Sequence, residues 1–135
     1  MIEIKNISMN YGSTQALDNV SFSVGEEGIL GLLGPNGAGK STLMKILTTF
    51  ICPSQGSAKI GGYDILQNPL QVREMVGYLP ENVPLYMDMR VDEYFSFVGG
   101  ARGIEGAALE KRFKWLREAC GIASVWKHNM SELSK

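Results

Sequence analysis

The stretch that decides the fold is Gly28-Ile29-Leu30-Gly31-Leu32-Leu33-Gly34-Pro35-Asn36-Gly37-Ala38-Gly39-Lys40-Ser41-Thr42, in which residues 34–41 match the pattern G-x-x-x-x-G-K-[ST] in full. This pattern is typical of a loop whose backbone N–H groups surround the phosphates of a nucleotide. Its ligand is therefore expected to be a nucleoside triphosphate.

Both flanks of the loop agree with this interpretation. Residues 28–33 are apolar on both faces, which predicts a buried strand of a parallel sheet. After the loop, apolar residues recur at the spacing of one helix face, at Leu43, Ile46, Leu47 and Phe50. A glycine-rich turn that fits the pattern by chance is the alternative, and these flanks argue against it.

Each residue type in the loop has a chemical reason. Gly34, Gly37 and Gly39 leave the backbone free to approach the phosphates, and the first N–H groups of the following helix lack partners within that helix. Lys40 supplies a cation for the outer phosphates, and Ser41 supplies a hydroxyl for Mg²⁺. The expected phosphate-binding set is Gly34, Pro35, Asn36, Gly37, Ala38, Gly39, Lys40, Ser41 and Thr42, with Lys40 also a catalytic candidate.

Composition limits the classes of function. The chain has 135 residues, 44% of them hydrophobic, and a formal net charge of −1, so it forms one domain or part of one and has no general attraction to nucleic acid or anionic membranes. A local basic run on a predicted helix, Lys111, Arg112, Lys114 and Arg117, is expected to be a solvated surface. Cys52 and Cys120 form no C-x-x-C pair, which favours a reducing compartment over a metal or redox site.

The sequence gives no sign of a membrane span or a secretory leader. Charged Glu3 and Lys5 stand where a signal peptide needs an apolar run, and no apolar stretch approaches the ~20 residues that cross a bilayer. We expect the chain in the cytoplasm unless a partner holds it at a membrane.

Periodicity predicts two parts, 1–81 and 82–135. In the first, residues 2–9 and the alternating run Val20 to Val24 predict antiparallel strands, and 57–60 and 76–79 predict short strands. In the second, helical spacing predicts one helix from Val91, Tyr94, Phe95 and Val98, and another from Leu109, Phe113, Leu116 and Cys120.

This order of elements closely resembles the nucleotide-binding subunit of ABC transporters over essentially the whole chain. The resemblance implies an α/β fold, with a P-loop NTPase core of ABC type, an antiparallel β subdomain and the start of a helical subdomain, all incomplete. It also implies ATP and Mg²⁺ as ligands, a membrane-spanning subunit that holds the chain at the cytoplasmic face, and a second nucleotide-binding subunit in a head-to-tail dimer. No nucleic acid partner is expected.

The same resemblance assigns two residues outside the loop. Tyr11 stands where the family places an aromatic that stacks on adenine, although it could instead pack on its own strand. In Gly77-Tyr78-Leu79-Pro80-Glu81-Asn82, as in a subgroup of bacterial ABC exporter ATPases, Glu81 replaces the family's glutamine near Mg²⁺ and the attacking water. Glu81 is thus a catalytic and metal-ligand candidate, and a plain loop residue is the alternative.

Other family features are absent from the sequence. Leu133-Ser134 resembles the start of the LSGGQ signature, with Lys135 in place of its first glycine, and His128 precedes the signature, so a surface or capping role is expected for it. The Walker B aspartate, the catalytic glutamate and the switch histidine are not found. We therefore expect no hydrolysis by this chain alone, and we expect the chain to expose apolar surface and an unpaired strand edge.

The predicted function is ATP binding and, in a complete protein, ATP hydrolysis that drives export by an ABC transporter. The alternatives are a soluble ABC-type ATPase that acts on ribosomes or nucleic acid, and a non-hydrolysing truncated nucleotide-binding module. A P-loop kinase or GTPase has no support, because no acceptor-binding or guanine-reading motif is found.

Overall fold

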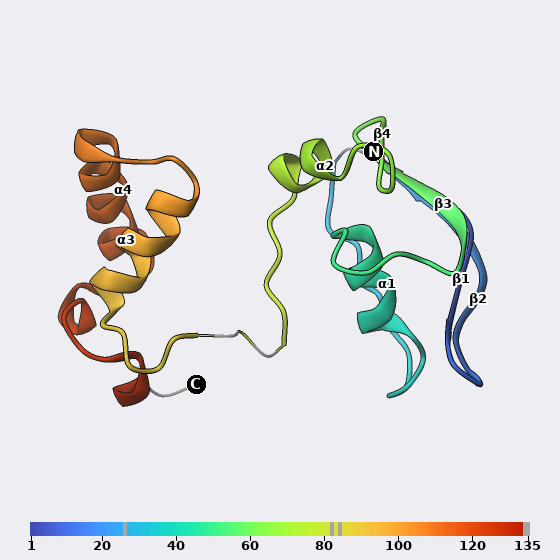
Figure 1. Ribbon diagram of the computed structural model, residues 1–135, viewed down its shortest axis with the longest axis horizontal. Helices are drawn as coiled ribbons and strands as arrows, with labels where there is room; N and C mark the ends of the chain where they lie inside the picture. The colour runs from blue at the N-terminus through green and yellow to red at the C-terminus, as the bar shows by residue number, and fades with distance from the viewer. Residues whose placement is uncertain (26, 82, 84, 134–135) are drawn as a thin grey trace. The chain divides into compact units, whose positions relative to one another are not determined.

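The computed structural model describes residues 1–25, 27–81, 83 and 85–133 (Figure 1). The chain forms two compact units, Met1–Leu79 and Pro80–Lys135, and each is described by itself. The division expected from the sequence lies after residue 81. None of the helices in the described ranges is long and apolar enough to cross a bilayer.

The first unit contains a four-stranded antiparallel sheet with the order β2-β1-β3-β4. Its strands are β1 (Ile2–Tyr11), β2 (Thr14–Val24), β3 (Gln55–Ile60) and β4 (Tyr63–Asp64). Ile4 of β1 lies opposite Phe22 of β2 and Ala58 of β3, which fixes the register. The antiparallel strands predicted in residues 2–9, 20–24 and 57–60 are confirmed.

An irregularity in β1 explains which of its side chains reach the core. Ile4 and Ile7 are both buried although they are three residues apart, because the pairing of β1 with β2 shifts between them. At this bulge Asn6 and Asn19 adopt left-handed φ angles of 53° and 48°. The side-chain amide of Asn6 donates to the side-chain oxygen of Asn19 at 2.7 Å, which holds the two bends together.

Helix α1 (Lys40–Leu47) places its apolar side against this sheet. Ile46 is fully buried, and it shares one core cluster with Ile4, Ile7, Leu17, Leu43, Leu47, Ala58, Ile60, Ile65 and Val72. Phe50, predicted on the same helix face, lies beyond the helix and is 73% exposed. That prediction was wrong because Thr49, at φ 59°, turns the chain out of the helix.

A short helix, α2 (Pro69–Met75), was not predicted. Pro69 stands at its first turn, where proline is tolerated, and the Asp64 carboxylate caps the preceding turn by accepting from the N–H groups of Leu66 and Gln67 at 2.8 and 3.1 Å. Only Val72 of this helix is buried, so the sequence shows no apolar period there.

Two predicted strands are not observed. Residues 29–33 and 76–79 have extended or irregular backbone and, within the described residues, pair with no strand. Ile29 and Leu33 are 103% and 92% exposed, not buried as a central parallel strand would be. The physical reason is that a parallel strand forms only beside a neighbour that supplies its hydrogen bonds. The chain was expected to expose apolar surface, and it does so at Ile29 and Leu33.

The second unit is helical, as predicted. It contains α3 (Val91–Ala101), α4 (Gly106–Ala119) and the single turns η1 (Ala123–Val125) and η2 (Met130–Glu132). Gly99 of α3 lies so close to Leu109 of α4 that a side chain there would collide with the leucine. The core of the unit is formed by Val91, Phe113, Trp126 and Met130.

Candidate phosphate-binding loop

The loop is anchored at the start of α1 by one glycine. Gly39 is the residue before the helix and has a left-handed φ of 81°. A Cβ at this position would collide with the backbone oxygen of Ala16 and would lie 2.6 Å from Cδ2 of Leu17. Gly39 therefore lets the loop rest directly on β2. Sequence reasoning assigned this glycine to phosphate approach and missed Ala16 and Leu17, because a tertiary contact leaves no local signal.

The rest of the loop is open to solvent. Residues 34–38 are all exposed, and Gly37, with φ 83°, has no atom within 4 Å of the place where a Cβ would stand. The Ala38 N–H donates to the Pro35 oxygen at 3.3 Å, so the chain turns here. Gly37 is thus needed for its backbone conformation, and it leaves free space on the face where a ligand would approach.

Lys40 folds back across this turn. Its Nζ donates to the backbone oxygens of Gly34 at 2.7 Å and Pro35 at 2.6 Å. An ammonium group has three donors, so one remains for an anion at the loop. The lysine thus places a positive charge directly over residues 34–35.

The start of α1 adds backbone donors beside the lysine. The Leu43 N–H donates to the Gly39 oxygen at 2.9 Å and closes the first helical turn. The N–H groups of Lys40, Ser41 and Thr42 precede that bond and have no acceptor within the helix. Together with the lysine, they form an arrangement that suits phosphate oxygens.

Ser41 is the loop residue that could reach a magnesium ion. It is exposed in the first turn of α1, whereas Thr42 is partly buried. In the described part of the chain, no group of three or more His, Cys, Asp or Glu side chains could hold a metal. A single hydroxyl fits Mg²⁺, because this ion keeps several waters and takes its other ligands from substrate phosphates.

Tyr11 lies in the same unit as the loop. It is paired with the first residue of β2, the strand on which the loop rests. It ends β1 opposite Thr14, next to the turn at Gly12, and is 48% exposed. Thr14 is two residues before Ala16, which contacts Gly39, so this end of the hairpin is roughly 7 Å along the strand from the base of the loop.

Two other candidates lie in the second unit. Glu81 is exposed and belongs to a different unit from the loop, and its role toward Mg²⁺ stays a prediction. His128 has a side chain 54% exposed, with Nδ1 3.9 Å from an oxygen of Glu132, which agrees with the expected surface role. Asn82, Ser134 and Lys135 lie outside the described residues.

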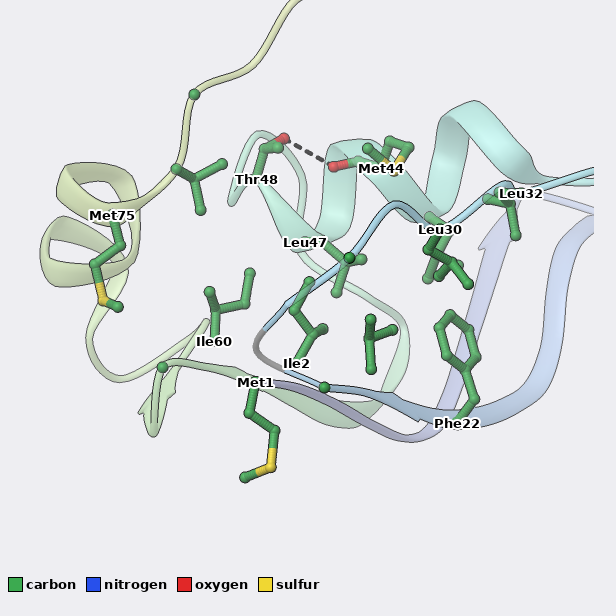
Figure 2. Close-up of a pocket in the computed structure, with 17 residues that line it drawn as sticks. Met1, Ile2, Phe22, Leu30, Leu32, Met44, Leu47, Thr48, Ile60 and Met75 are labelled. Carbon is green, nitrogen blue, oxygen red and sulfur yellow. Dashed lines mark hydrogen bonds between the residues drawn. The ribbon is translucent and has the colours of Figure 1, made fainter.

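The first unit also contains an apolar cavity of about 460 Å³ (Figure 2). Side chains from the inner face of the sheet, from α1 and from the segment before the loop line it, among them Ile2, Phe22, Leu30, Leu47 and Ile60. Thr48 brings a hydroxyl, but that group already donates to the Met44 oxygen at 2.8 Å. With so few polar groups, this cavity is a space between apolar layers and does not suit a triphosphate.

The antiparallel sheet, the glycine-rich loop over residues 34–39 and Lys40 together define a nucleotide-binding domain of the P-loop class. The family described as ABC transporter matches residues 17–135. The chain therefore belongs to the ABC transporter family, as the sequence suggested, and its fold is an incomplete α/β nucleotide-binding domain of that family.

Several known proteins are similar to this chain. The probable multidrug ABC transporter ATP-binding protein YbhF of Escherichia coli (strain K12) is 35% identical over 133 residues, which cover 98% of this chain and 23% of that protein. The doxorubicin resistance ATP-binding protein DrrA of Mycobacterium tuberculosis (strain ATCC 25618 / H37Rv) is 33% identical over 135 residues, covering 98% of this chain and 41% of DrrA.

Solved structures agree in fold. The ATP binding subunit of an ABC transporter superposes with a TM-score of 0.82 at 29% identity, over 99% of this chain and 56% of that one. The dimeric cassette MJ0796 superposes with a TM-score of 0.83 at 22% identity, over 99% of this chain and 63% of that one, which shows the fold alone. The chain thus spans between about a quarter and two thirds of the length of these proteins.

Proposed function

We propose that this chain binds ATP with Mg²⁺ through residues 34–42 and Tyr11, as the nucleotide-binding part of an ABC transporter. The observation that supports this most is the position of Lys40, whose side chain folds back over the glycine-rich loop at the exposed N-terminus of α1. The names of the relatives, which are ATP-binding proteins, point to the same ligand.

Each residue of the site has a distinct role in this proposal. The N–H groups of Gly37 and of residues 39–42 donate to the phosphates, and Lys40 neutralises their outer charge. When bound, Mg²⁺ shields the charge of the phosphates, and Ser41 holds it through its hydroxyl. Tyr11 offers a half-exposed ring on which adenine stacks.

In the whole protein we propose that ATP hydrolysis drives export by a membrane-spanning partner, with a second nucleotide-binding subunit opposite. Names that mention multidrug, doxorubicin and linearmycin resistance favour export, although one relative is named as a sulfate/thiosulfate import protein. Glu81 is proposed to act near the metal. YbhF is named as a multidrug ABC transporter protein, which favours this function over a soluble ATPase of ribosomes or nucleic acid.

Equilibrium binding of a fluorescent ATP analogue with Mg²⁺ tests the proposed site. Lys40→Ala should weaken binding at least tenfold, because it removes a charge-assisted contact that corresponds to about 1.4 kcal/mol or more. Lys45→Ala is the matched control, since Lys45 is an exposed lysine in the last turn of the same helix and should leave affinity unchanged.

Tyr11 can be tested in the same assay. Tyr11→Ala should weaken binding about tenfold, whereas Tyr11→Phe should retain it, because stacking needs the ring and not the hydroxyl. Unchanged affinity in both Lys40→Ala and Tyr11→Ala would contradict the assignment of the site.

A further inference from the structure

At the start of helix α3 the Glu93 carboxylate accepts from the Arg90 N–H at 3.0 Å, but the side chain of the residue before the helix makes no cap hydrogen bond. The residue before it is Arg90, whose guanidinium carries donors and no acceptor. The first two helical N–H groups bond instead to another part of the chain. The Val91 N–H donates to the His128 oxygen at 3.0 Å, and the Asp92 N–H donates to the Trp126 oxygen at 3.1 Å. The segment 126–128 therefore serves as the cap of α3.

Further backbone bonds continue this pairing on both sides of Arg90. The Met130 N–H donates to the Met89 oxygen at 2.9 Å, and the Ser131 N–H donates to the Met87 oxygen at 3.2 Å. Arg90 and Asn129 form an antiparallel bridge between them. Segments 87–92 and 126–131 thus run side by side, although α3 and α4 separate them in the sequence.

A carboxylate joins the two segments on their outer side. Both Asp92 oxygens accept from Arg90, from Nε and Nη2 at 3.0 Å each, and Oδ2 also accepts from Lys127 Nζ at 2.6 Å. The Asp92 side chain is only 14% exposed. Partial burial raises the pKa of this carboxyl, but hydrogen bonds from Lys127 and Arg90 and their charges outweigh it and lower the pKa from 3.8 to about 2.

The residue next to Lys127 fixes the same segment from inside. Trp126 is 7% exposed. Its ring stacks on that of Phe95, with 5.6 Å between the ring centroids, and it forms a T-shaped contact with Phe113, with 5.2 Å between the centroids. Two neighbouring residues therefore fix this segment: Lys127 through its contact with Asp92, and Trp126 through its packing in the core. The segment continues directly to Leu133, whose N–H donates to the Met130 oxygen at 3.2 Å.

We propose that Asp92 is a positioning residue, which clamps segment 126–133 to the start of α3 by joining Arg90 to Lys127. The meaning of the clamp rests on the proposed function, because Leu133 leads into the region that resembles the family's signature. The clamp thus fixes the position of Leu133, from which the chain enters that region. The clamp also ties it to residues 87–92, which follow the candidate Glu81.

Backbone hydrogen exchange of the 135-residue chain at neutral pH tests the clamp. Asp92→Asn keeps the shape of the side chain but removes its charge. We expect at least tenfold faster exchange at Val91, Met130 and Ser131, with unchanged exchange in the middle of α4. Asp88→Asn is the matched control, since Asp88 is exposed and lies shortly before Arg90, and it should leave all these amides protected.

A rescue separates this role from a general loss of stability. Asp92→Glu retains the charge and should restore part of the protection. Unchanged exchange in Asp92→Asn, or equal loss of protection throughout α4, would overturn the clamp. ATP binding by residues 34–42 is measured in parallel and should be the same in wild type and Asp92→Asn. Absence of ATP binding in every variant would overturn the proposed function, while the exchange data would still decide the clamp.

Discussion

Two residues show how single groups determine the local structure of each unit. Gly39 satisfies two demands at once, a left-handed φ and contact with the backbone of Ala16, so no other residue can replace it without moving the loop from β2. Asp92 joins Arg90 to Lys127 in one place, beside the segment 126–128 whose backbone oxygens cap α3.

The pH dependence of the second unit follows from Asp92. Its folded pKa lies below the ordinary 3.8, so the ionised carboxylate stabilises the unit above about pH 4, and this contribution is lost as the pH falls from about 4 toward 2. The contribution is about 2 kcal/mol at most, because Lys127 is 68% exposed and partly screened.

Urea unfolding followed by tryptophan fluorescence, which reports on the second unit because Trp115 and Trp126 both lie there, measures this effect in wild type and Asp92→Asn at pH 6 and at pH about 2.5. The stability difference between them should shrink at the lower pH, because the contribution of the ionised carboxylate falls as the pH approaches 2. The variant comparison is needed because two other pairs of ionisable groups lie in the same unit, Arg90–Glu93 at 3.5 Å and His128–Glu132 at 3.9 Å. A difference that is as large at low pH as at pH 6 would show that the charge of Asp92 is not the source.

At the scale of the element, α1 is the clearest case of a helix whose ends are set by backbone geometry. Its last turn closes with two bonds, from the Thr49 N–H to the Ile46 oxygen at 3.0 Å and from the Phe50 N–H to the Lys45 oxygen at 2.8 Å. This is the Schellman arrangement, which usually places glycine where Thr49 stands. A β-branched residue at φ 59° is strained.

Replacing Thr49 with glycine should therefore stabilise the first unit. We expect a gain of about 0.5–1 kcal/mol in the free energy of unfolding, because relief of strain exceeds the loss of the exposed bond from Arg73 Nε to Thr49 Oγ1. Thr48→Gly is the control. Because Thr48 has an ordinary φ of −83°, this change should lower the free energy of unfolding by a similar amount. Urea titration followed by NMR signals of α1 measures both, and destabilisation by Thr49→Gly would contradict the strain.

Local patterns predicted the elements that depend on local chemistry. Strands β1 to β3 and helices α3 and α4 were found from apolar periods, and the phosphate-binding loop was found from its glycines and Lys40. The strands predicted at 29–33 and 76–79 were wrong because a period says nothing about whether a neighbouring strand exists. The contact of Gly39 with Ala16 and the Asp92 clamp join residues far apart in sequence, so neither has a local signal.

At the scale of the whole molecule, exposed apolar groups are the main feature. Ile29 and Leu33 are almost wholly exposed, and they belong to the segment that reaches the apolar cavity through Leu30 and Leu32. Apolar surface of this kind favours association in water.

We therefore expect concentration-dependent self-association of this chain. The double change Ile29→Lys and Leu33→Lys should shift sedimentation toward the monomer, whereas Leu70→Lys, at an exposed leucine of α2, should have little effect. A wild-type chain that sediments as a monomer at all concentrations, or an equal shift in the control, would show that residues 29–33 are not responsible.

The most direct test of ATP binding at residues 34–42 is to map backbone amide shifts by NMR as Mg²⁺-ATP is added to the intact chain. We predict saturable shifts at Gly37 to Thr42 and at Tyr11, absent in Lys40→Ala, with the amides of α3 and α4 unchanged. Saturable shifts confined to the apolar cavity, or none at the loop at millimolar ATP, would contradict the account.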